Sequence, residues 1–301
     1  MQYRDFNKYK ISPLCFGTAT FVSGKLRPNK DSQQGISCLA QALNLGINFV
    51  HSNPNLGTQW AIREVLATHA KSPRHLIKVE LPLIQEYDLL KRYFLEKFGK
   101  SKKELGVSHI EGVVYERDKK KSPNPVDPKT NLANYSMIRR IFDELKSEGE
   151  TDSLACLVDS PHEMRLAIDF KHFDSFASYF NLFDVWPSQF FDELKSISKN
   201  FIAVRPLRHG LLVDNPVIEN KYAENMAKQM STQFLSYLRT IKGERSLQDL
   251  AIRFALAHPT VKTLIVGASH GQHLDELIQS SEQPLEKDEF NEIILEIGRR
   301  I

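Results

Sequence analysis

The sequence predicts an α/β protein folded as a single (β/α)8 barrel over residues 1–301, and three observations support this prediction. Short apolar runs typical of strands alternate along the chain with segments whose apolar residues recur at helical spacing. Strands that alternate with helices favour a parallel sheet, and such a sheet can close into a barrel. The length of 301 residues suits one such barrel, which commonly takes roughly 250 residues.

The first elements place a polar residue at the end of a strand. A strand over residues 11–18 closes on Gly17, where the missing side chain lets the backbone approach a ligand. A helix follows over 33–45 and stops at Gly46. The next strand, 47–50, leads directly into His51, and another helix begins near residue 58. The carboxyl ends of strands are where α/β barrels place their chemistry, so His51 is a candidate functional residue.

The same alternation continues to the end of the chain. The predicted elements are a helix over 61–70, a strand over 75–82, a helix over 89–98, a strand over 105–118, a helix over 135–147, a strand over 154–158, a strand over 176–182, a helix over 190–197, a strand and its loop over 201–212, a helix over 246–257 and a strand over 261–266. Two polar insertions interrupt the pattern. The stretch 118–134, rich in Lys, Pro and Asn, predicts an exposed loop, and 214–245 predicts a largely helical insertion.

Composition indicates a globular protein and argues against some partners. Basic residues number 40 against 37 acidic ones, and this excess is too small to indicate a nucleic-acid partner. No apolar stretch approaches the roughly 20 residues of a membrane span or resembles a signal peptide, so we expect a cytoplasmic protein without a membrane partner. The three cysteines, Cys15, Cys38 and Cys156, form no close pair and are expected to be reduced thiols. Cys15 and Cys156 fall in apolar strand-like runs and are expected to be buried.

Several motifs resemble one known family. The stretch 46–57, GINFVHSNPNLG, is similar to the aldo-keto reductase segment Gly-Ile-Asn-Phe-Phe-Asp-Thr-Ala-x-x-Tyr-Gly. Residues 105–116 are similar to the family's fourth strand, 205–212 to its Ser-Pro-Leu-x-x-Gly-x-Leu loop, and 267–269 to its phosphate-binding turn. The resemblance covers essentially the whole chain in order. It implies a (β/α)8 barrel and an oxidoreductase that uses NADP(H).

The resemblance also locates the family's catalytic positions. Family members reduce a carbonyl with a nicotinamide hydride and a proton from a Tyr, assisted by a Lys, an Asp and a His. Here these positions correspond to Leu56 for Tyr, His51 for Asp, Glu80 for Lys and Glu116 for His. A shift of two residues would place Lys78 in the Lys position, and strand alternation puts Lys78 and Glu80 on the same face. His51, Glu80 and Glu116 are therefore the catalytic candidates, and the usual set is missing.

The cofactor positions carried over from the family are only partly kept. They are Thr18, Asp159, Arg205, Leu207, Ser269 and His273. Asp159 falls near the family's Ser-Asn pair and Ala177 replaces its Gln, and both changes remove hydrogen bonds to the nicotinamide. The turn ending at Ser269 precedes a helix N-terminus, which suits the 2'-phosphate of NADP. Binding of NADP(H) and the absence of any cofactor both stay open.

Three functions stay open. The first is a repurposed or inactive barrel that binds a small molecule or a protein partner, a role for which the family offers accessory subunits as precedents. The second is a divergent NADP(H) oxidoreductase whose proton comes from His51 or Tyr115. The third is an acid/base enzyme of the epimerase or dehydratase type, acting on a sugar-like substrate with His51, Glu80 and Glu116. A homo-oligomer is also compatible with the sequence.

Purely structural roles would also explain the same residues. His51, Glu80 and Glu116 would also form an ion-paired plug in a site that has lost its function. A metal site is not predicted, because nothing brings the three groups to ligand distances of about 2 Å. Arg205, Arg208 and His209 form a candidate anion site, for example for a sugar phosphate, but capping helices or pairing with surface acids would explain each one individually.

Overall fold

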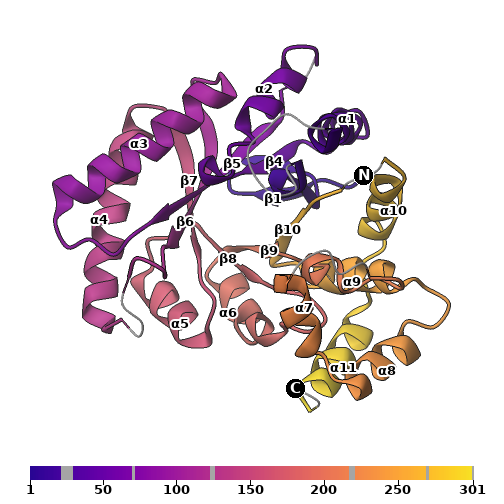
Figure 1. Ribbon diagram of the computed structural model, residues 1–301. Helices are drawn as coiled ribbons and strands as arrows, with labels where there is room; N and C mark the ends of the chain where they lie inside the picture. The colour runs from indigo at the N-terminus through magenta and orange to yellow at the C-terminus, as the bar shows by residue number, and fades with distance from the viewer. Residues whose placement is uncertain (22–29, 70–71, 123–125, 217–220, 269–270, 300–301) are drawn as a thin grey trace. The chain divides into compact units, whose positions relative to one another are not determined.

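The computed structural model describes residues 1–21, 30–69, 72–122, 126–216, 221–268 and 271–299 (Figure 1). Eight parallel strands form a closed barrel in the order β10-β3-β4-β5-β6-β7-β8-β9. The predicted (β/α)8 fold class is confirmed. Within the described residues, no helix combines the length and the apolar character needed to cross a membrane.

The strands and helices alternate as expected. The barrel strands are β3 Leu14–Gly17, β4 Phe49–Ser52, β5 Arg74–Leu81, β6 Ile110–Arg117, β7 Thr151–Leu157, β8 Ser175–Tyr179, β9 Asn200–Val204 and β10 Val261–Val266. The helices are α1 Lys30–Asn44, α2 Gln59–Leu66, α3 Tyr87–Leu105, α4 Pro128–Ser147, α5 Pro161–Phe170, α6 Phe191–Ser196, α7 Lys221–Lys228, α8 Thr232–Ile241, α9 Leu247–Leu256, α10 Gly271–Ser281 and α11 Lys287–Gly298. Short 3₁₀ turns are η1 Thr18–Phe21, η2 Pro54–Leu56, η3 Trp186–Phe190 and η4 Arg208–Gly210.

Two compact units make up the chain. The central unit comprises Cys15–Ala177 and Gly267–Gly271. The terminal unit comprises Met1–Leu14, Ser178–Val266 and Gln272–Ile301. The single domain predicted over residues 1–301 stays a prediction, because the chain divides into these two units.

The central unit contains the strands that carry the candidate catalytic residues. Strand β5 pairs in parallel with β4 on one side and with β6 on the other. Helices α1 to α4 follow one another as neighbours around this unit (Figure 1). Because side chains alternate along a strand, every second residue of β5 faces the barrel interior, and the residues between them pack toward the helices.

An aromatic cluster fills the layer between strands and helices of the central unit. The ring of Phe173 meets Tyr135 edge-on with 5.0 Å between centroids, and it also contacts Phe170 at 5.3 Å and Phe176 at 6.3 Å. Phe173 is fully buried. Such edge-to-face pairs add to the free energy gained by burying apolar area, so this cluster fixes α4 and α5 against the strands.

The terminal unit has its own aromatic core and an added hairpin. Phe180 packs against Phe191 at 4.9 Å and stacks on Phe254 at 5.3 Å. Strands β1 Arg4–Phe6 and β2 Tyr9–Ile11 form an antiparallel hairpin. The guanidinium of Arg4 donates to the carbonyl oxygen of Val261 at 2.6 Å, which ties the hairpin to β10.

Two sequence-based boundaries were incomplete. The loop expected over 118–134 is wrong in its second half, because α4 begins at Pro128. Asp127 caps this helix by accepting a hydrogen bond from the backbone N–H of Thr130 at 3.0 Å. The insertion over 214–245 contains two helices, α7 and α8, and Ser231 caps the second. The β1–β2 hairpin and helices α5 and α11 were not predicted. All three cysteines are free, as expected, and the predicted burial of Cys15 and Cys156 is confirmed; Cys38 is also buried.

The aromatic cluster gives a stability prediction. We expect Phe173→Ala to lower the free energy of unfolding by about 3–5 kcal/mol, because it removes a buried ring and leaves a cavity between rings that cannot collapse. Urea unfolding followed by circular dichroism measures this loss. Leu295→Ala on α11 is the control, since Leu295 is 62% exposed and its loss should stay within roughly 0.5 kcal/mol. Equal stability of the two variants would contradict the role given to Phe173.

Candidate active site

The candidate catalytic residues of the central unit stand on neighbouring strands. His51 on β4 is aligned with Leu76 on β5, two residues before Lys78. Glu80 on β5 is aligned with Glu116 on β6. Adjacent strands lie about 4.8 Å apart, so these side chains share the carboxyl end of the inner face.

An ion pair joins β5 to β6 on this face. The ammonium group of Lys78 contacts Oε2 of Glu116, and the two side chains are 22% and 18% exposed. The charge of Glu116 is therefore neutralised by Lys78. Of the two residues considered for the Lys position, Lys78 supplies an amine next to the candidate residues, whereas Glu80 makes its contact elsewhere.

His51 is held in its neutral form. Burial, and secondarily the positive charge of Lys78, lower the pKa of His51 to about 3. An imidazole with this pKa is not an imidazolium cation near neutral pH, although it keeps one N–H. His51 then carries no charge beside Glu80 and Glu116, and the ion pair observed on this face joins Lys78 to Glu116.

Glu80 belongs to a second polar cluster. Its Oε2 accepts a hydrogen bond of 3.0 Å from the side-chain amide of Asn55 in η2. The Oδ1 of Asn55 in turn accepts from the ammonium of Lys97 on α3 at 3.0 Å. Burial lowers the pKa of Lys97, although the nearby charge of Glu80 opposes this shift. Asn55 therefore links an acid on the barrel to an amine on an outer helix.

Neither the residue in the family's Tyr position, Leu56, nor the two candidate proton donors of the divergent oxidoreductase, Tyr115 and His51, is suited to supply the proton. Leu56 occupies the expected Tyr position, is 38% exposed and has no proton to give. Tyr115 lies on the helix-facing side of β6, is fully buried, and its hydroxyl donates to Oδ1 of Asn134 on α4 at 2.8 Å. The prediction that Tyr115 supplies the proton is wrong for this reason, and His51 is neutral.

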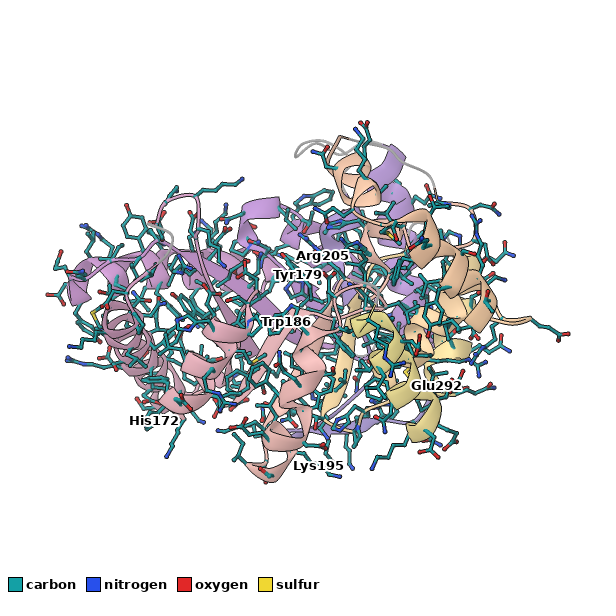
Figure 2. All side chains as sticks on the ribbon, turned by 90° about the horizontal axis from the view of Figure 1, so that it is seen from below. His172, Tyr179, Trp186, Lys195, Arg205 and Glu292 are labelled. Atoms are coloured by element: carbon teal, nitrogen blue, oxygen red, sulfur yellow. The ribbon has the colours of Figure 1, made fainter. Side chains whose placement is uncertain are left out.

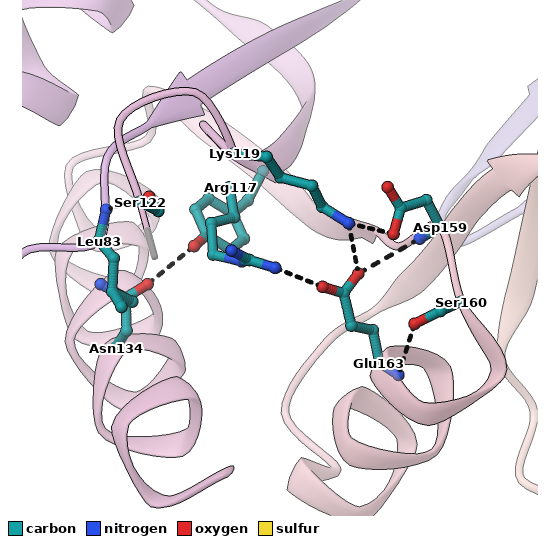
Figure 3. Close-up of polar contacts among 9 residues, drawn as sticks. Leu83, Arg117, Lys119, Ser122, Asn134, Asp159, Ser160 and Glu163 are labelled. Atoms are coloured by element: carbon teal, nitrogen blue, oxygen red, sulfur yellow. Dashed lines mark hydrogen bonds and ion pairs between the residues drawn. The ribbon is translucent and has the colours of Figure 1, made fainter. Parts of the chain in front are cut away.

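A charged network closes the end of β6 against α5 (Figure 3). Arg117, which is 8% exposed, donates to Oε1 of Glu163 at 2.5 Å. Lys119 pairs with Asp159 and lies 3.3 Å from Oε2 of Glu163. Burial alone would raise the pKa of Glu163, but the hydrogen bond from Arg117 and the charge of Lys119 outweigh it and lower that pKa. Burial raises the pKa of Asp159, against the pull of Lys119.

The residues aligned with the family's nicotinamide contacts do not fit a carboxamide. The carboxylate of Asp159 is taken up by Lys119 (Figure 3). The hydroxyl of Ser160 accepts the backbone N–H of Glu163 at 3.2 Å, as the cap of α5. Ala177 is fully buried and has no polar side-chain atom. Thr18 is also buried, with its hydroxyl 2.9 Å from that of Thr58.

The remaining cofactor candidates lie on the terminal unit or outside the described residues. Arg205 and Leu207 belong to the loop after β9, and two guanidinium groups, those of Arg205 and Arg208, line a cavity there. This arrangement fits a phosphate-bearing group. His273 is exposed on α10. Ser269 lies outside the described residues.

Sequence reasoning missed the partners of the candidate residues. Asn55 stands in the motif that drew attention to His51, but nothing in the sequence connects it to Lys97, which lies 42 residues further along. The pairing of Lys78 with Glu116 also joins residues on different strands. Strand alternation could have singled out Lys78 as an inner-face cation, since it predicts the same face for Lys78 and Glu80.

Comparisons with known proteins agree with the fold. Residues 13–294 match the model of the Aldo/keto reductase family. The chain is 22% identical over 271 residues to the "Uncharacterized oxidoreductase YqkF" of Bacillus subtilis (strain 168), covering 83% of each protein.

Two solved structures are similar over nearly the whole chain. The holo form of aldo-keto reductase AKR11C1 from Bacillus halodurans has a TM-score of 0.77 at 20% identity, covering 99% of this chain and 96% of the other. The glycerol dehydrogenase AKR11B4 from Gluconobacter oxydans has a TM-score of 0.76 at 17% identity, covering 99% and 95%. At these identities the likeness supports the fold alone.

The protonation of His51 is directly measurable. At about pH 5 an ordinary imidazole is mostly protonated, whereas we expect His51 to stay neutral because its pKa is about 3. Lys78→Met should raise this pKa by removing a nearby positive charge, while burial keeps it below the ordinary value. NMR titration of the imidazole carbons measures both. Lys100→Met removes a lysine that is 53% exposed on α3 and should leave His51 unchanged. A His51 that titrates near 6.5 would contradict the assignment.

Proposed function

Because the chain belongs to the aldo/keto reductase family, we propose that it is a repurposed member, which binds a small molecule and does not reduce carbonyls by the family's tyrosine-dependent mechanism. Its family and fold are those of oxidoreductases, and the proposal concerns only the chemistry of the strand ends. Such a member could also bind a protein partner, a role for which the family has precedents.

The observation that supports the proposal is that, among the described residues of the central unit, no tyrosine hydroxyl stands on the inner face of a strand. In the central unit, Tyr115 is the tyrosine on a strand, and its hydroxyl is committed to Asn134. Tyr87, Tyr93 and Tyr135 stand on α3 and α4. A general acid contributes roughly 10²–10⁴-fold to such reactions, so a site without one loses most of its rate.

The neighbouring groups offer no replacement acid of the usual kind. In the family the lysine adjusts the pKa of the phenol, but here Lys78 faces Glu116. With a pKa of about 3, His51 has no imidazolium proton at neutral pH and so offers no strong general acid. Glu116 and Glu80 accept hydrogen bonds from Lys78 and Asn55. This pattern supports a binding site lined with satisfied polar groups.

A divergent NADP(H) oxidoreductase is the second candidate. It is favoured by the ammonium of Lys78 on the inner face, which would take the place of the phenol as a donor to a carbonyl oxygen. NADP(H) is typical of the family, and the paired guanidinium groups after β9 suit its phosphates. Against it stand Asp159, which is paired with Lys119, Ser160, which caps α5, and Ala177, which has no polar side-chain atom.

The acid/base enzyme is the least supported candidate. An epimerase or dehydratase of the kind considered would need His51 to change its protonation state near neutral pH, and a pKa of about 3 opposes this. The carboxylates of Glu80 and Glu116 are also engaged by different partners, so they do not act as a pair.

Cofactor turnover separates the first two candidates. With NADPH and a panel of simple aldehydes and ketones, we expect the purified protein to consume no more NADPH than a blank, because no acid is placed to protonate the product. Absorbance at the reduced-nicotinamide band measures this. Steady consumption that Lys78→Met abolishes, and that Lys100→Met on the surface of α3 preserves, would establish the divergent oxidoreductase instead. Both variants lose one positive charge, so the comparison controls for net charge.

A further inference from the structure

A cavity of about 300 Å³ lies wholly within the terminal unit. Residues that follow β8 and β9 line it, together with residues at the end of α7. Its volume is at the lower end of the roughly 300–1,000 Å³ typical of small-molecule sites. The cavity therefore suits a compact ligand.

Arg208 is a buried and fixed cation in the wall of this cavity. It is 1% exposed, its Nη1 donates to Oδ2 of Asp184 at 2.6 Å, and its Nη2 donates to Oε1 of Gln229 at 2.8 Å. The guanidinium carbon lies 3.6 Å from the ring centroid of Phe183. Its Nε is buried and has no hydrogen-bond partner among the described residues. A buried donor without a partner costs free energy.

Arg205 presents a second guanidinium to the same cavity. It stacks over the ring of Tyr179 with 4.3 Å to the centroid (Figure 2). Stacking of this kind fixes the plane of the guanidinium while its edges remain suited to oxyanions. In the family this position is a Ser, so the second cation is a feature of this chain.

The backbone of the loop is strained in a way that places both arginines. Arg205, Arg208 and His209 have φ of 57°, 45° and 57°, in the left-handed region. Each such residue costs on the order of 1–3 kcal/mol and persists where surrounding contacts enforce it. Asn181 provides such a contact, since its Nδ2 donates to the carbonyl oxygen of Arg205 at 3.1 Å and to Oδ2 of Asp184 at 2.9 Å.

The lining carries more positive than negative charge. Two guanidinium groups face one carboxylate, that of Asp184. Although much of His209 stays exposed, desolvation and then the charges of Arg205 and Arg208 lower its pKa to about 4. The two guanidinium groups outnumber the one carboxylate of the lining, and this excess of positive charge favours an anion.

We infer that this cavity binds a phosphate monoester of about the size of a sugar phosphate, with Arg205 and Arg208 on the phosphate. The inference rests on the proposed small-molecule role and names its ligand class. A phosphate is preferred to a carboxylate because its three terminal oxygens can accept from two guanidinium groups and from the side-chain amides of Asn225 and Gln229 together. The rest of the cavity leaves room for a small polar body.

Calorimetric titration of the full-length protein tests this inference. Glucose 6-phosphate is the probe, with glucose and inorganic phosphate at equal ionic strength as comparisons. We expect the ester to bind, glucose to show no binding, and inorganic phosphate to bind more weakly than the ester. Arg205→Gln should weaken binding of the ester at least tenfold. Arg165→Gln on α5, where Arg165 is 46% exposed, removes the same charge and should leave the affinity unchanged.

A second readout places the ligand. The charges of Arg205 and Arg208 lower the pKa of His209, so a phosphate bound to these two arginines should raise that pKa in an NMR titration, which a distant site would not do. If Arg208→Gln fails to fold, Gln229→Ala tests the same contact, and we expect it to weaken binding.

Three results would overturn the inference: equal affinity for glucose and its phosphate, equal affinity for the ester and inorganic phosphate, or unchanged binding by the Arg205→Gln variant. Steady NADPH consumption by the same preparation would contradict the proposed function. The relative affinities for glucose 6-phosphate, glucose and inorganic phosphate would still test the phosphate site separately.

Discussion

The ion pair between Lys78 and Glu116 is the interaction on which the chemistry of the central unit depends. Both groups are mostly shielded from water, and a charge in such a place must be paired to be tolerated. Pairing them removes Glu116 as a free base and leaves the field of the ammonium directed at His51. The neutral imidazole follows from that field and from burial. Burial is the larger cause of the low pKa of His51, and the ion pair adds the nearby charge of Lys78 to it.

Under the proposed function, this arrangement differs from that of a reductase site. A reductase places a phenol where an amine can adjust its pKa, so the phenol can donate a proton to the carbonyl oxygen as it is reduced. Here the amine is bound to a carboxylate, and the loop position that follows β4 presents the exposed side chain of Leu56. The terminal unit contributes a separate feature, a strained loop with Arg205 and Arg208.

Much of the fold could be predicted from the sequence, because the spacing of apolar residues within a short segment distinguishes a strand from a helix. The start of α4 could also have been predicted, since Asp127 followed by Pro128 is a typical beginning of a helix. The Lys, Pro and Asn residues around it favoured the prediction of a loop instead. The positions of His51 and Glu80 came from family motifs. Their partners could not be predicted, because the contact of Asn55 with Lys97 depends on how α3 packs.

The measurement that tests the central claim most directly is a crystal structure of the protein soaked at high concentration with NADP. The account predicts that Lys78 stays paired with Glu116 and that no nicotinamide ring lies against His51. A map that shows an ordered nicotinamide over Lys78, with a tyrosine hydroxyl beside that amine, would contradict the account and restore an ordinary reductase.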